Sequence, residues 1–504
     1  MHLRVKEPGN IIEVLNCSQT ELDKLIELAT AKRWSWQSKK YIEKCYMVLF
    51  RFLPSGLYRR ILGLTKDGYH VQLDNFESLF DKNIDDNVID AWIDKEQFSF
   101  APRWYQLEAL YKALKFKRCK FEIATGGGKS FIIAMVTRYL LQNELKNGQQ
   151  VLIVTIRQML VDQMIDDIYS YKRDKLITYQ PVYAGTERVE NANVIVGTYQ
   201  SLSKWPKENF ANVGAVIVDE VHSGKIASIK DGIMPKINVD KCKRFLGFTG
   251  TMPEDAIDQL HLEAYFGPTL MKVTAKELME EKSIADIRIK IVELNYSKAI
   301  SKSYFFDEDV QAGGPKRLAA ERAWLHTQPQ RNELLKTICS RFIGNQVILV
   351  ESVDYAKFLV DWLGTIEGKE TRLIYGGVKK KVRNEIVQEL KLEKDNYILV
   401  ATYETMSTGV SINNIMSVHF PDGGKSRIRI RQSLGRGLRL HPKKEWLTVF
   451  DYYDRLHKDF GDGTDENPGW PGPSSNIFAT HARIRKKIYQ DQGFEYKEVK
   501  FDID

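Results

Sequence analysis

The chain has few cysteines and no long hydrophobic run. Its five cysteines, Cys17, Cys45, Cys119, Cys242 and Cys339, are far apart and include no C-x-x-C pair. This spacing argues against a disulfide framework and against a structural zinc site. No apolar stretch approaches the roughly 18 residues that a membrane-spanning helix needs, and the first ten residues contain no apolar signal-peptide segment. We therefore expect a cytoplasmic protein with reduced, buried cysteines and no membrane contact.

The length and composition are those of a globular protein with several domains. The 504 residues are 43% hydrophobic and 28% charged, which is enough apolar material for more than one core. At usual domain sizes this length predicts about three domains. The net charge of +8 permits an anionic partner without requiring one. Residues 1–70 carry 12 basic and 7 acidic side chains, whereas residues 71–98 carry 2 and 8, which indicates a basic module followed by a connecting segment.

Residues 1–95 are predicted to form a small α/β domain. Asn10–Asn16 has the pattern of a strand, and Ser18 with Glu21 forms a capping box. Apolar residues at helical spacing then predict a helix over residues 19–32.

Beyond residue 120, short apolar segments alternate with helical ones, which is typical of a parallel sheet buried on both faces. The pattern occurs twice, so the predicted fold class is α/β with two tandem parallel sheets, in domains at 96–275 and 276–458. Residues 459–504 are expected to be a loop and a basic C-terminal extension with a helix at Ala482–Tyr489. The predicted strands are Phe121–Ala124, Val151–Thr155, Val194–Gly197, Ala215–Val218 and Phe245–Phe248 in the first sheet, and Gln346–Val350, Leu373–Tyr375, Ile398–Ala401, Ser417–Phe420 and Thr448–Asp451 in the second.

A glycine-rich segment follows the first predicted strand and precedes a predicted helix over Phe131–Leu141. Its residues Thr125, Gly126, Gly127, Gly128, Lys129 and Ser130 are typical of a phosphate-binding loop. Glycines let backbone N–H groups converge on phosphate oxygens, and a helix N-terminus adds positive potential. Lys129 can reach the terminal phosphates of ATP, and the hydroxyl of Ser130 can bind Mg²⁺. The structural alternative is a glycine-rich turn that contains Lys-Ser by chance.

Two acids end the apolar segment Ala215–Val218. In an open parallel sheet, ligands bind at the carboxyl ends of the strands. Asp219 is therefore predicted to hold Mg²⁺, and Glu220 to polarise the attacking water. An acidic loop after a strand is the structural alternative, but the phosphate loop upstream favours the catalytic interpretation. The spacing of His222 from these acids favours a role in coupling hydrolysis to the second domain.

The order of these motifs resembles that of superfamily-2 helicases of the DExH type. Residues 219–222 read DEVH, and the other motifs of the family occur before and after them in the family's order. The matching segments are Pro102–Gln106, Thr155–Gln163, Gly197–Leu202, Thr249–Thr251, Ala401–Thr402, Ser407–Ser411 and Gln432–Arg439. The resemblance implies two RecA-like domains, ATP hydrolysis with Mg²⁺, and movement along nucleic acid.

The resemblance also implies roles for individual residues. The implied nucleotide contacts outside the phosphate loop are Gly409 and two residues that recognise the adenine base, Arg103 and Gln106. The implied contacts to the nucleic-acid strand are Thr155, Arg157, Gln163, Thr198, Gln200 and Thr402. Thr249 and Thr251 are implied to act with His222 in coupling. Gln432, Arg436 and Arg439 complete the implied catalytic set, the two arginines as fingers that stabilise negative charge on the phosphoryl oxygens.

Within this superfamily the chain is similar to the phage UvsW-type branched-DNA helicases. The similarity rests on Trp104-Tyr105-Gln106, on Leu53-Pro54-x-Gly56-Leu57 and on the overall layout. It implies unwinding of forks, four-way junctions and R-loops in recombination, repair and replication, by a monomer in the host cytoplasm. Three alternatives stay open: a translocase on double-stranded DNA that does not separate strands, an RNA helicase, and a nucleotide-gated binding subunit with little catalysis.

A tract from Lys32 to Arg60 interleaves cationic and aromatic side chains, as nucleic-acid-binding surfaces do. Most of the aromatics are better explained as the core of a small domain, since a domain of this size needs large apolar residues. The predicted contacts to DNA are therefore the charges, namely Lys39, Lys40, Arg59 and Arg60.

Overall fold

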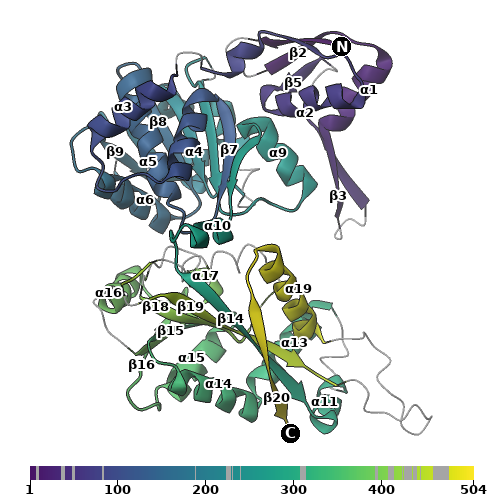
Figure 1. Ribbon diagram of the computed structural model, residues 1–504, viewed down its shortest axis with the longest axis vertical. Coiled ribbons are helices and arrows are strands. Elements are labelled where there is room, and N and C mark those ends of the chain that lie inside the picture. The colour runs from purple at the N-terminus through teal and green to yellow at the C-terminus, as the bar shows by residue number, and fades with distance from the viewer. Residues whose placement is uncertain are drawn as a thin grey trace. The chain divides into compact units, whose positions relative to one another are not determined.

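The computed structural model divides into two compact units, Met1–Val273 and Thr274–Asp504 (Figure 1). Each unit contains a seven-stranded parallel sheet, which confirms the predicted α/β class with two tandem sheets. The structure describes residues 1–6, 11–35, 40–47, 51–81, 84–187, 189–222, 229, 231–238, 240–306, 314–391, 396–406, 412, 414–422, 424, 434, 440–442, 444–457 and 476–504. None of the described helices combines the length and the hydropathy required to cross a lipid bilayer.

The N-terminal part of the first unit contains a four-stranded sheet with the order β5-β2-β1-β6. Its strands are β1 (His2–Lys6), β2 (Ile11–Asn16), β5 (Phe52–Pro54) and β6 (Gln72–Asp74). The predicted first strand corresponds to β2, and the capping box of Ser18 and Glu21 begins α1 (Gln19–Leu28) as predicted. The helix ends earlier than predicted, because residues 30–35 pair with a second strand.

That pairing forms a separate two-stranded arm of β3 (Thr30–Ser35) and β4 (Lys40–Cys45), which are antiparallel. Figure 1 shows β3 projecting from the rest of the N-terminal part. Most side chains of β4 are exposed, including Lys40, Tyr41 and Lys44, so the arm presents positive charge to solvent. Cys45 is also exposed, in contrast to the prediction that the cysteines are buried; Cys119, Cys242 and Cys339 are buried as predicted.

The N-terminal part shares its core with helix α9 (Ala256–Phe266), so it is not an independent domain ending near residue 95. Leu260 and Ala264 of α9 belong to the same buried cluster as Leu3, Leu25 and Ile61. Gly56 lies directly against this helix, since a Cβ placed on it would come within 2.1 Å of the carbonyl oxygen of Glu263. An ion pair of 2.7 Å between Arg60 Nε and Glu263 Oε2 borders the contact.

The first large sheet has the strand order β13-β7-β12-β11-β8-β10-β9 and parallel pairing throughout. Its strands are β7 (Arg118–Ile123), β8 (Gln150–Thr155), β9 (Tyr179–Val182), β10 (Val194–Thr198), β11 (Val213–Asp219), β12 (Arg244–Thr249) and β13 (Thr269–Val273). All five predicted strands are present. The two that the sequence pattern misses, β9 and β13, lie at the edges of the sheet, where strands are half exposed and lack a continuous apolar run.

Helices follow most strands of this unit, and α4, α5 and α6 pack side by side. Besides α1 and α9, its helices are α2 (Tyr58–Gly63), α3 (Asp86–Glu96), α4 (Trp104–Lys115), α5 (Lys129–Tyr139), α6 (Gln158–Tyr171) and α7 (Tyr199–Lys204). The helix predicted at Phe131–Leu141 corresponds to α5, and a π-helical turn over Leu140–Glu144 extends it.

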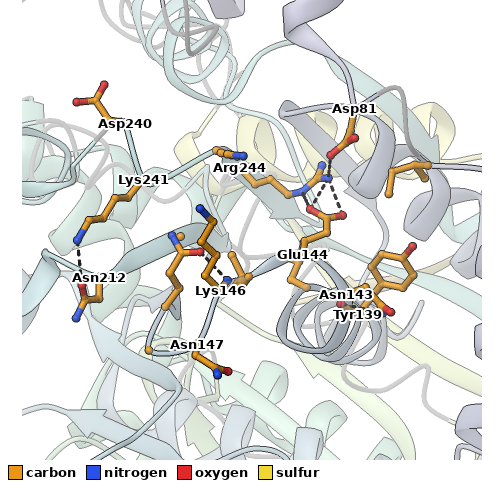
Figure 2. Close-up of a pocket in the computed structure, with 17 residues that line it drawn as sticks. Asp81, Tyr139, Asn143, Glu144, Lys146, Asn147, Asn212, Asp240, Lys241 and Arg244 are labelled. Carbon is orange, nitrogen blue, oxygen red and sulfur yellow. Dashed lines mark hydrogen bonds and ion pairs between the residues drawn. The ribbon is translucent and has the colours of Figure 1, made fainter.

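A buried cation ties this turn to the amino-terminal end of the sheet. Arg244, the first residue of β12, donates hydrogen bonds of 2.8 Å to both carboxylate oxygens of Glu144 and one of 3.0 Å to Asp81 (Figure 2). Burial raises the pKa of Glu144, and the Arg244 guanidinium opposes that shift. These residues line a cavity of about 660 Å³ together with Lys146, Lys241 and neighbouring residues.

The second large sheet is also parallel and has the order β16-β17-β15-β18-β19-β14-β20. Its strands are β14 (Asp286–Tyr296), β15 (Asn345–Val350), β16 (Glu370–Ile374), β17 (Tyr397–Thr402), β18 (Ile415–Phe420), β19 (Trp446–Arg455) and β20 (Tyr496–Ile503). Its described helices are α10 (Ala275–Glu280), α11 (Lys298–Phe305), α13 (Gly314–His326), α14 (Pro329–Arg341), α15 (Val353–Leu363), α16 (Lys380–Lys391), α17 (Tyr403–Met406) and α19 (Ile477–Asp491).

The C-terminal residues are part of this second unit, unlike the separate extension predicted from the sequence. The predicted basic helix is present as α19, but Arg485 on it is buried and donates hydrogen bonds of 2.9 and 2.7 Å to Asp451 of β19. Tyr489 donates another of 2.7 Å to the same carboxylate. The last strand, β20, then pairs with β14.

Replacing Gly56 with alanine is expected to weaken the attachment of the N-terminal part. The new methyl group would clash with backbone atoms of α9, which cannot rotate away as a side chain can. Overpacking of this kind costs about 1–3 kcal/mol of unfolding free energy, which chemical denaturation of the full chain would measure. Gly63→Ala is the control, because nothing lies within 4 Å of its added Cβ. Equal stability of the two variants would contradict the shared core.

Candidate functional site

The phosphate loop connects β7 to α5 at the carboxyl end of the first large sheet. Gly126 and Gly128 have φ angles of 91° and 75°, in the left-handed region that favours glycine. A Cβ on Gly128 would lie 2.4 Å from Nε2 of Gln106, so glycine is also required for space. The strand–loop–helix context predicted from the sequence is therefore present, with the first turn of α5 beginning at Lys129.

Of the two residues predicted to recognise adenine, Gln106 contacts this loop and Arg103 contacts Tyr105. The buried Gln106 donates a hydrogen bond of 3.2 Å from Nε2 to the carbonyl oxygen of Gly127. Its Oε1 accepts one of 2.9 Å from the backbone N–H of Arg103, where α4 begins. The Arg103 guanidinium lies 3.3 Å from the hydroxyl of Tyr105. Gln106 thus joins the start of α4 to the phosphate loop.

The side chain of Lys129 lies between the loop and the acidic pair. Its Nζ atom donates to the carbonyl oxygen of Ile123 at 3.3 Å and lies 3.7 Å from Glu220 Oε1. Both side chains are largely buried. A lysine placed between a phosphate loop and a carboxylate is positioned to exchange the carboxylate for the phosphates of a bound nucleotide.

The acidic pair lies at the end of β11, as predicted. Asp219 is the last residue of the strand, and its carboxylate accepts a hydrogen bond of 3.0 Å from the backbone N–H of Glu220. Glu220 has a φ of 50°, so the chain turns sharply directly after Asp219. Burial and then the charge of Glu220 raise the pKa of Asp219, while the Lys129 ammonium lowers it. A positive charge brought to this site would favour the ionised carboxylate.

Hydrogen bonds join His222, Thr249 and Thr251, and His222 also lies close to the carboxylate of Glu220. The Nδ1 atom of His222 lies 3.3 Å from Glu220 Oε2 and also contacts the hydroxyl of Thr249. That hydroxyl donates to the carbonyl oxygen of Thr251 at 2.7 Å and accepts from its N–H at 3.1 Å. Burial lowers the pKa of His222, so its imidazole is neutral at pH 7. The structure thus joins the ends of β11 and β12, as a coupling role requires.

The donor set suits a magnesium ion that arrives with the nucleotide. Within the described residues, no cluster of three or more His, Cys, Asp or Glu side chains could hold a metal by itself. Mg²⁺ is usually bound by one or two carboxylates together with substrate phosphates and water. Ser130 in the loop and Asp219 on β11 therefore fit as the protein's oxygen ligands. The hydroxyl of Ser130 lies 2.7 Å from that of Tyr171, a neighbour that no local sequence pattern indicates.

The residues predicted to contact a nucleic-acid strand divide into buried and accessible ones. Thr155 and Thr198 are register partners at the ends of β8 and β10, and both are buried. Thr198 caps α7 by accepting a hydrogen bond from Ser201, while the neighbouring Gln200 is exposed. In the second unit Thr402 is buried and bonded to Thr405 at 2.8 Å. The threonines therefore shape these turns.

Two further predicted strand contacts lie in or beside α6. Arg157 directly precedes α6, makes no side-chain capping hydrogen bond and is half-buried. Gln163 has an Oε1 atom with no hydrogen-bond partner among the residues that the structure describes. Exposed or half-buried side chains such as Gln200 and Arg157 are the ones that a strand can reach without a rearrangement.

The residues of the N-terminal part that are predicted to contact DNA differ in exposure and in hydrogen bonding. Lys40 and Arg59 are exposed. Arg60 is held by Glu263 and by a hydrogen bond of 3.2 Å to the carbonyl oxygen of Leu28, a packing role that the sequence does not indicate. Five predicted site residues lie outside the described residues: Lys39, Gly409, Gln432, Arg436 and Arg439.

The cavity of about 660 Å³ in Figure 2 is a different place from this site. Its lining residues precede β8, β11 and β12, for example Gln149, Asn212 and Lys243, so it opens at the amino-terminal edge of the sheet. The phosphate loop, Asp219 and Thr249 lie at the carboxyl edge. In open α/β sheets the carboxyl edge is where ligands bind.

Comparison with known proteins agrees with this arrangement. The family described as "Type III restriction enzyme, res subunit" matches residues 99–254, and "Helicase conserved C-terminal domain" matches residues 330–441. The "ATP-dependent DNA helicase uvsW" of Enterobacteria phage T4 is 28% identical over 421 residues, which cover 80% of each protein. A "Probable ATP-dependent RNA helicase" of Methanocaldococcus jannaschii is 25% identical over 376 residues, covering 71% of this chain and 87% of that protein.

More distant similarity extends to a restriction enzyme and to a solved helicase structure. The "Type I restriction enzyme EcoAI endonuclease subunit" of Escherichia coli is 21% identical over 402 residues, covering 70% of this chain and 46% of that protein. The structure of a Saccharomyces cerevisiae Dbp5 variant bound to RNA and ADP BeF3 has a TM-score of 0.51 at 15% identity, covering 80% of this chain and 94% of that chain, which shows a shared fold. Two family models match consecutive parts of the chain, and a phage helicase matches most of its length. The chain is an ATP-dependent helicase, and over most of its length it is similar to the uvsW helicase of phage T4.

Proposed function

We propose that the protein is an ATP-dependent DNA helicase that unwinds or branch-migrates forks, four-way junctions and R-loops. The observation that carries the proposal is the continuous series Lys129–Glu220–His222–Thr249. It joins the phosphate loop to the end of β12 through contacts that a change at the nucleotide would disturb. Similarity to a phage DNA helicase over most of the chain supports DNA as the substrate.

In this mechanism, Gln106 and Arg103 select the base, and the loop glycines with Lys129 bind the phosphates. Ser130 and Asp219 would hold Mg²⁺, which when bound would supply positive charge that offsets the charge of the phosphoryl group. Glu220 accepts a hydrogen bond from the attacking water and orients it. Arg436 and Arg439 keep their predicted role of stabilising the transition state. When Lys129 turns from Glu220 to the phosphates, the contact between Glu220 and His222 would change, and with it the hydrogen bonds of Thr249 and Thr251.

The exposed cations of the β3–β4 arm and Arg59 are the proposed grip on duplex or junction DNA. The arm combines exposed Lys40 and Lys44 with exposed Tyr41. Positive side chains release counterions from the DNA backbone when they bind it. The neighbouring aromatic residues Tyr46 and Tyr58 are packed in the interior, as the composition argument predicted.

Two alternatives have support from specific relatives. A translocase that pumps double-stranded DNA is suggested by the restriction-enzyme relative, and an RNA helicase by the archaeal relative. ATPase stimulation should be compared across single-stranded DNA, duplex DNA, a four-way junction and RNA. The proposal expects the junction to stimulate most, with strand displacement on forked DNA. Triplex displacement without fork unwinding would favour the translocase, and stimulation by RNA alone would favour the RNA helicase.

Glu220→Gln is expected to lower ATP turnover at least about 100-fold, because an amide cannot act as the proton-accepting group for water. Nucleotide binding should persist, since the phosphate loop is intact. Lys129→Ala should lose both binding and turnover. Steady-state hydrolysis and binding of a fluorescent ADP analogue would measure the two effects. Glu208→Gln, at an exposed acid of the same unit, is the matched control; normal turnover in Glu220→Gln would remove this residue from the mechanism.

The double variant Lys40→Ala/Lys44→Ala is expected to weaken junction binding without changing basal ATP hydrolysis. Each lost phosphate contact should reduce the slope of log affinity against log salt by about 0.9. Fluorescence anisotropy of a labelled four-way junction, titrated at several salt concentrations, would measure this slope. The control is Arg4→Ala/Lys66→Ala, which removes the same charge from other exposed positions of the N-terminal part. Identical slopes in both variants would argue that the arm makes no contact with DNA. Substitution is preferable to deletion, since the N-terminal part shares its core with α9.

A further inference from the structure

The proposed magnesium ligand Ser130 has a hydroxyl neighbour from another helix. The Oγ atom of Ser130, in the first turn of α5, lies 2.7 Å from the hydroxyl of Tyr171, the last residue of α6. The Tyr171 ring packs against Phe131, with ring centroids 4.8 Å apart. Tyr171 is therefore both part of the packing between α5 and α6 and a direct contact of the group that would bind the metal.

The position of Tyr171 is fixed from several sides. Its carbonyl oxygen accepts a hydrogen bond of 2.8 Å from the N–H of Ser99, shortly before the residues predicted to recognise adenine. Just beyond it, Asp174 accepts hydrogen bonds of 3.1 and 2.6 Å from Arg138 of α5. A movement of the end of α6 relative to α5 would therefore displace the hydroxyl of Tyr171.

The other end of α6 lies where a strand is predicted to bind. The helix begins at Gln158, directly after Thr155 and Arg157. Its 14 residues span about 20 Å at the usual helical rise. Val161, Met164 and Ile168 bury one face along its length, so one continuously packed element connects its two ends. A displacement at its first turn is thus carried to Tyr171.

The hydrogen bond between the two hydroxyl groups affects how the Ser130 hydroxyl is oriented toward a metal. Each hydroxyl has one proton to donate and two lone pairs. When Ser130 donates its proton to Tyr171, both of its lone pairs point away from Tyr171 and are available to a metal. When the contact is lost, the serine hydroxyl rotates freely, and the metal must fix it at an entropic cost.

We propose that Tyr171 is a positioning residue that orients the Ser130 hydroxyl for Mg²⁺ and links it, through α6, to the strand-binding end of that helix. The inference rests on the proposed role of Ser130 as a metal ligand. It assigns to α6 a second connection between strand and nucleotide, separate from the series through His222 and Thr249. Tyr171 makes no bond to the reacting atoms; it acts through Ser130.

Tyr171→Phe removes the hydroxyl and keeps the ring that packs on Phe131. Binding of a fluorescent ADP analogue would be titrated in EDTA and over a range of Mg²⁺ concentrations. We expect unchanged affinity in EDTA and a gain in affinity from Mg²⁺ that is about threefold to tenfold smaller than in the wild type, the usual effect of one hydrogen bond. Tyr169→Phe, an exposed tyrosine of the same helix, is the control. An equal Mg²⁺ effect in all three proteins, or an equal loss with and without Mg²⁺, would overturn the proposal.

A second experiment adds single-stranded DNA and measures the half-saturating Mg²⁺ concentration for ADP binding. We expect DNA to shift this concentration in the wild type and in Tyr169→Phe, but not in Tyr171→Phe. The same shift in Tyr171→Phe would overturn the link through α6.

Ser130→Ala distinguishes this inference from the role on which it rests. If Ser130→Ala keeps the full Mg²⁺ effect, the assignment of Ser130 as a ligand fails and the inference fails with it. If Ser130→Ala loses the effect and Tyr171→Phe keeps it, only the inference fails. Adding Tyr171→Phe to Ser130→Ala should cause no further loss, since the two residues act through one contact.

Discussion

Asp219 and Glu220 are two adjacent, largely buried carboxylates, and the arrangement of the site in the first unit depends on how their negative charge is offset. A buried charge is costly unless a partner of opposite sign or a hydrogen-bond donor lies close to it. Lys129 supplies the cation for Glu220, and the backbone of the sharp turn supplies a donor for Asp219. The strand order β7-β12-β11 makes this arrangement possible, because the loop after β7, Thr249 at the end of β12 and Asp219 at the end of β11 lie at the same edge of the sheet. In the proposed mechanism a bound nucleotide would change this balance of charges, and the contacts Glu220–His222 and His222–Thr249 would carry the change to the end of β12.

Sequence patterns predict strands with a continuous apolar run better than exposed or alternating strands. All ten predicted strands are present, including β16 at an edge of the second sheet. By contrast, β14 alternates charged and apolar residues, as Arg288 and Lys290 illustrate, and its partner β20 is mostly exposed. Strands of this kind are stabilised by pairing with neighbouring strands, and those neighbours are distant in the sequence. The early end of α1 has the same cause, since β3 is stabilised by β4.

The candidate site shows the same difference between features that a local sequence pattern reveals and features that depend on distant contacts. The glycine loop and the acidic pair are local motifs, so sequence alone identifies them. Contacts between elements are not encoded locally: Tyr171 reaches Ser130 across 41 positions of the sequence, and Arg60 reaches Glu263 across 203. Their residue types are ordinary, and no spacing rule connects them. The basic character of the N-terminal part was visible, but which cations are exposed and which hold the packing depends on the fold.

The strand order of the second sheet bears on how the chain acquires its structure during synthesis. Strand β14 lies between β19 and β20, yet it is made long before either of them. The first unit has all its strands once residue 273 has left the ribosome, whereas β14 must wait for residues 446–455 and 496–503 before both of its edges are paired. Until then its backbone donors and acceptors are exposed to other chains. Residues 496–503 therefore pair the second edge of β14, and the second sheet is complete only after these residues have been synthesised.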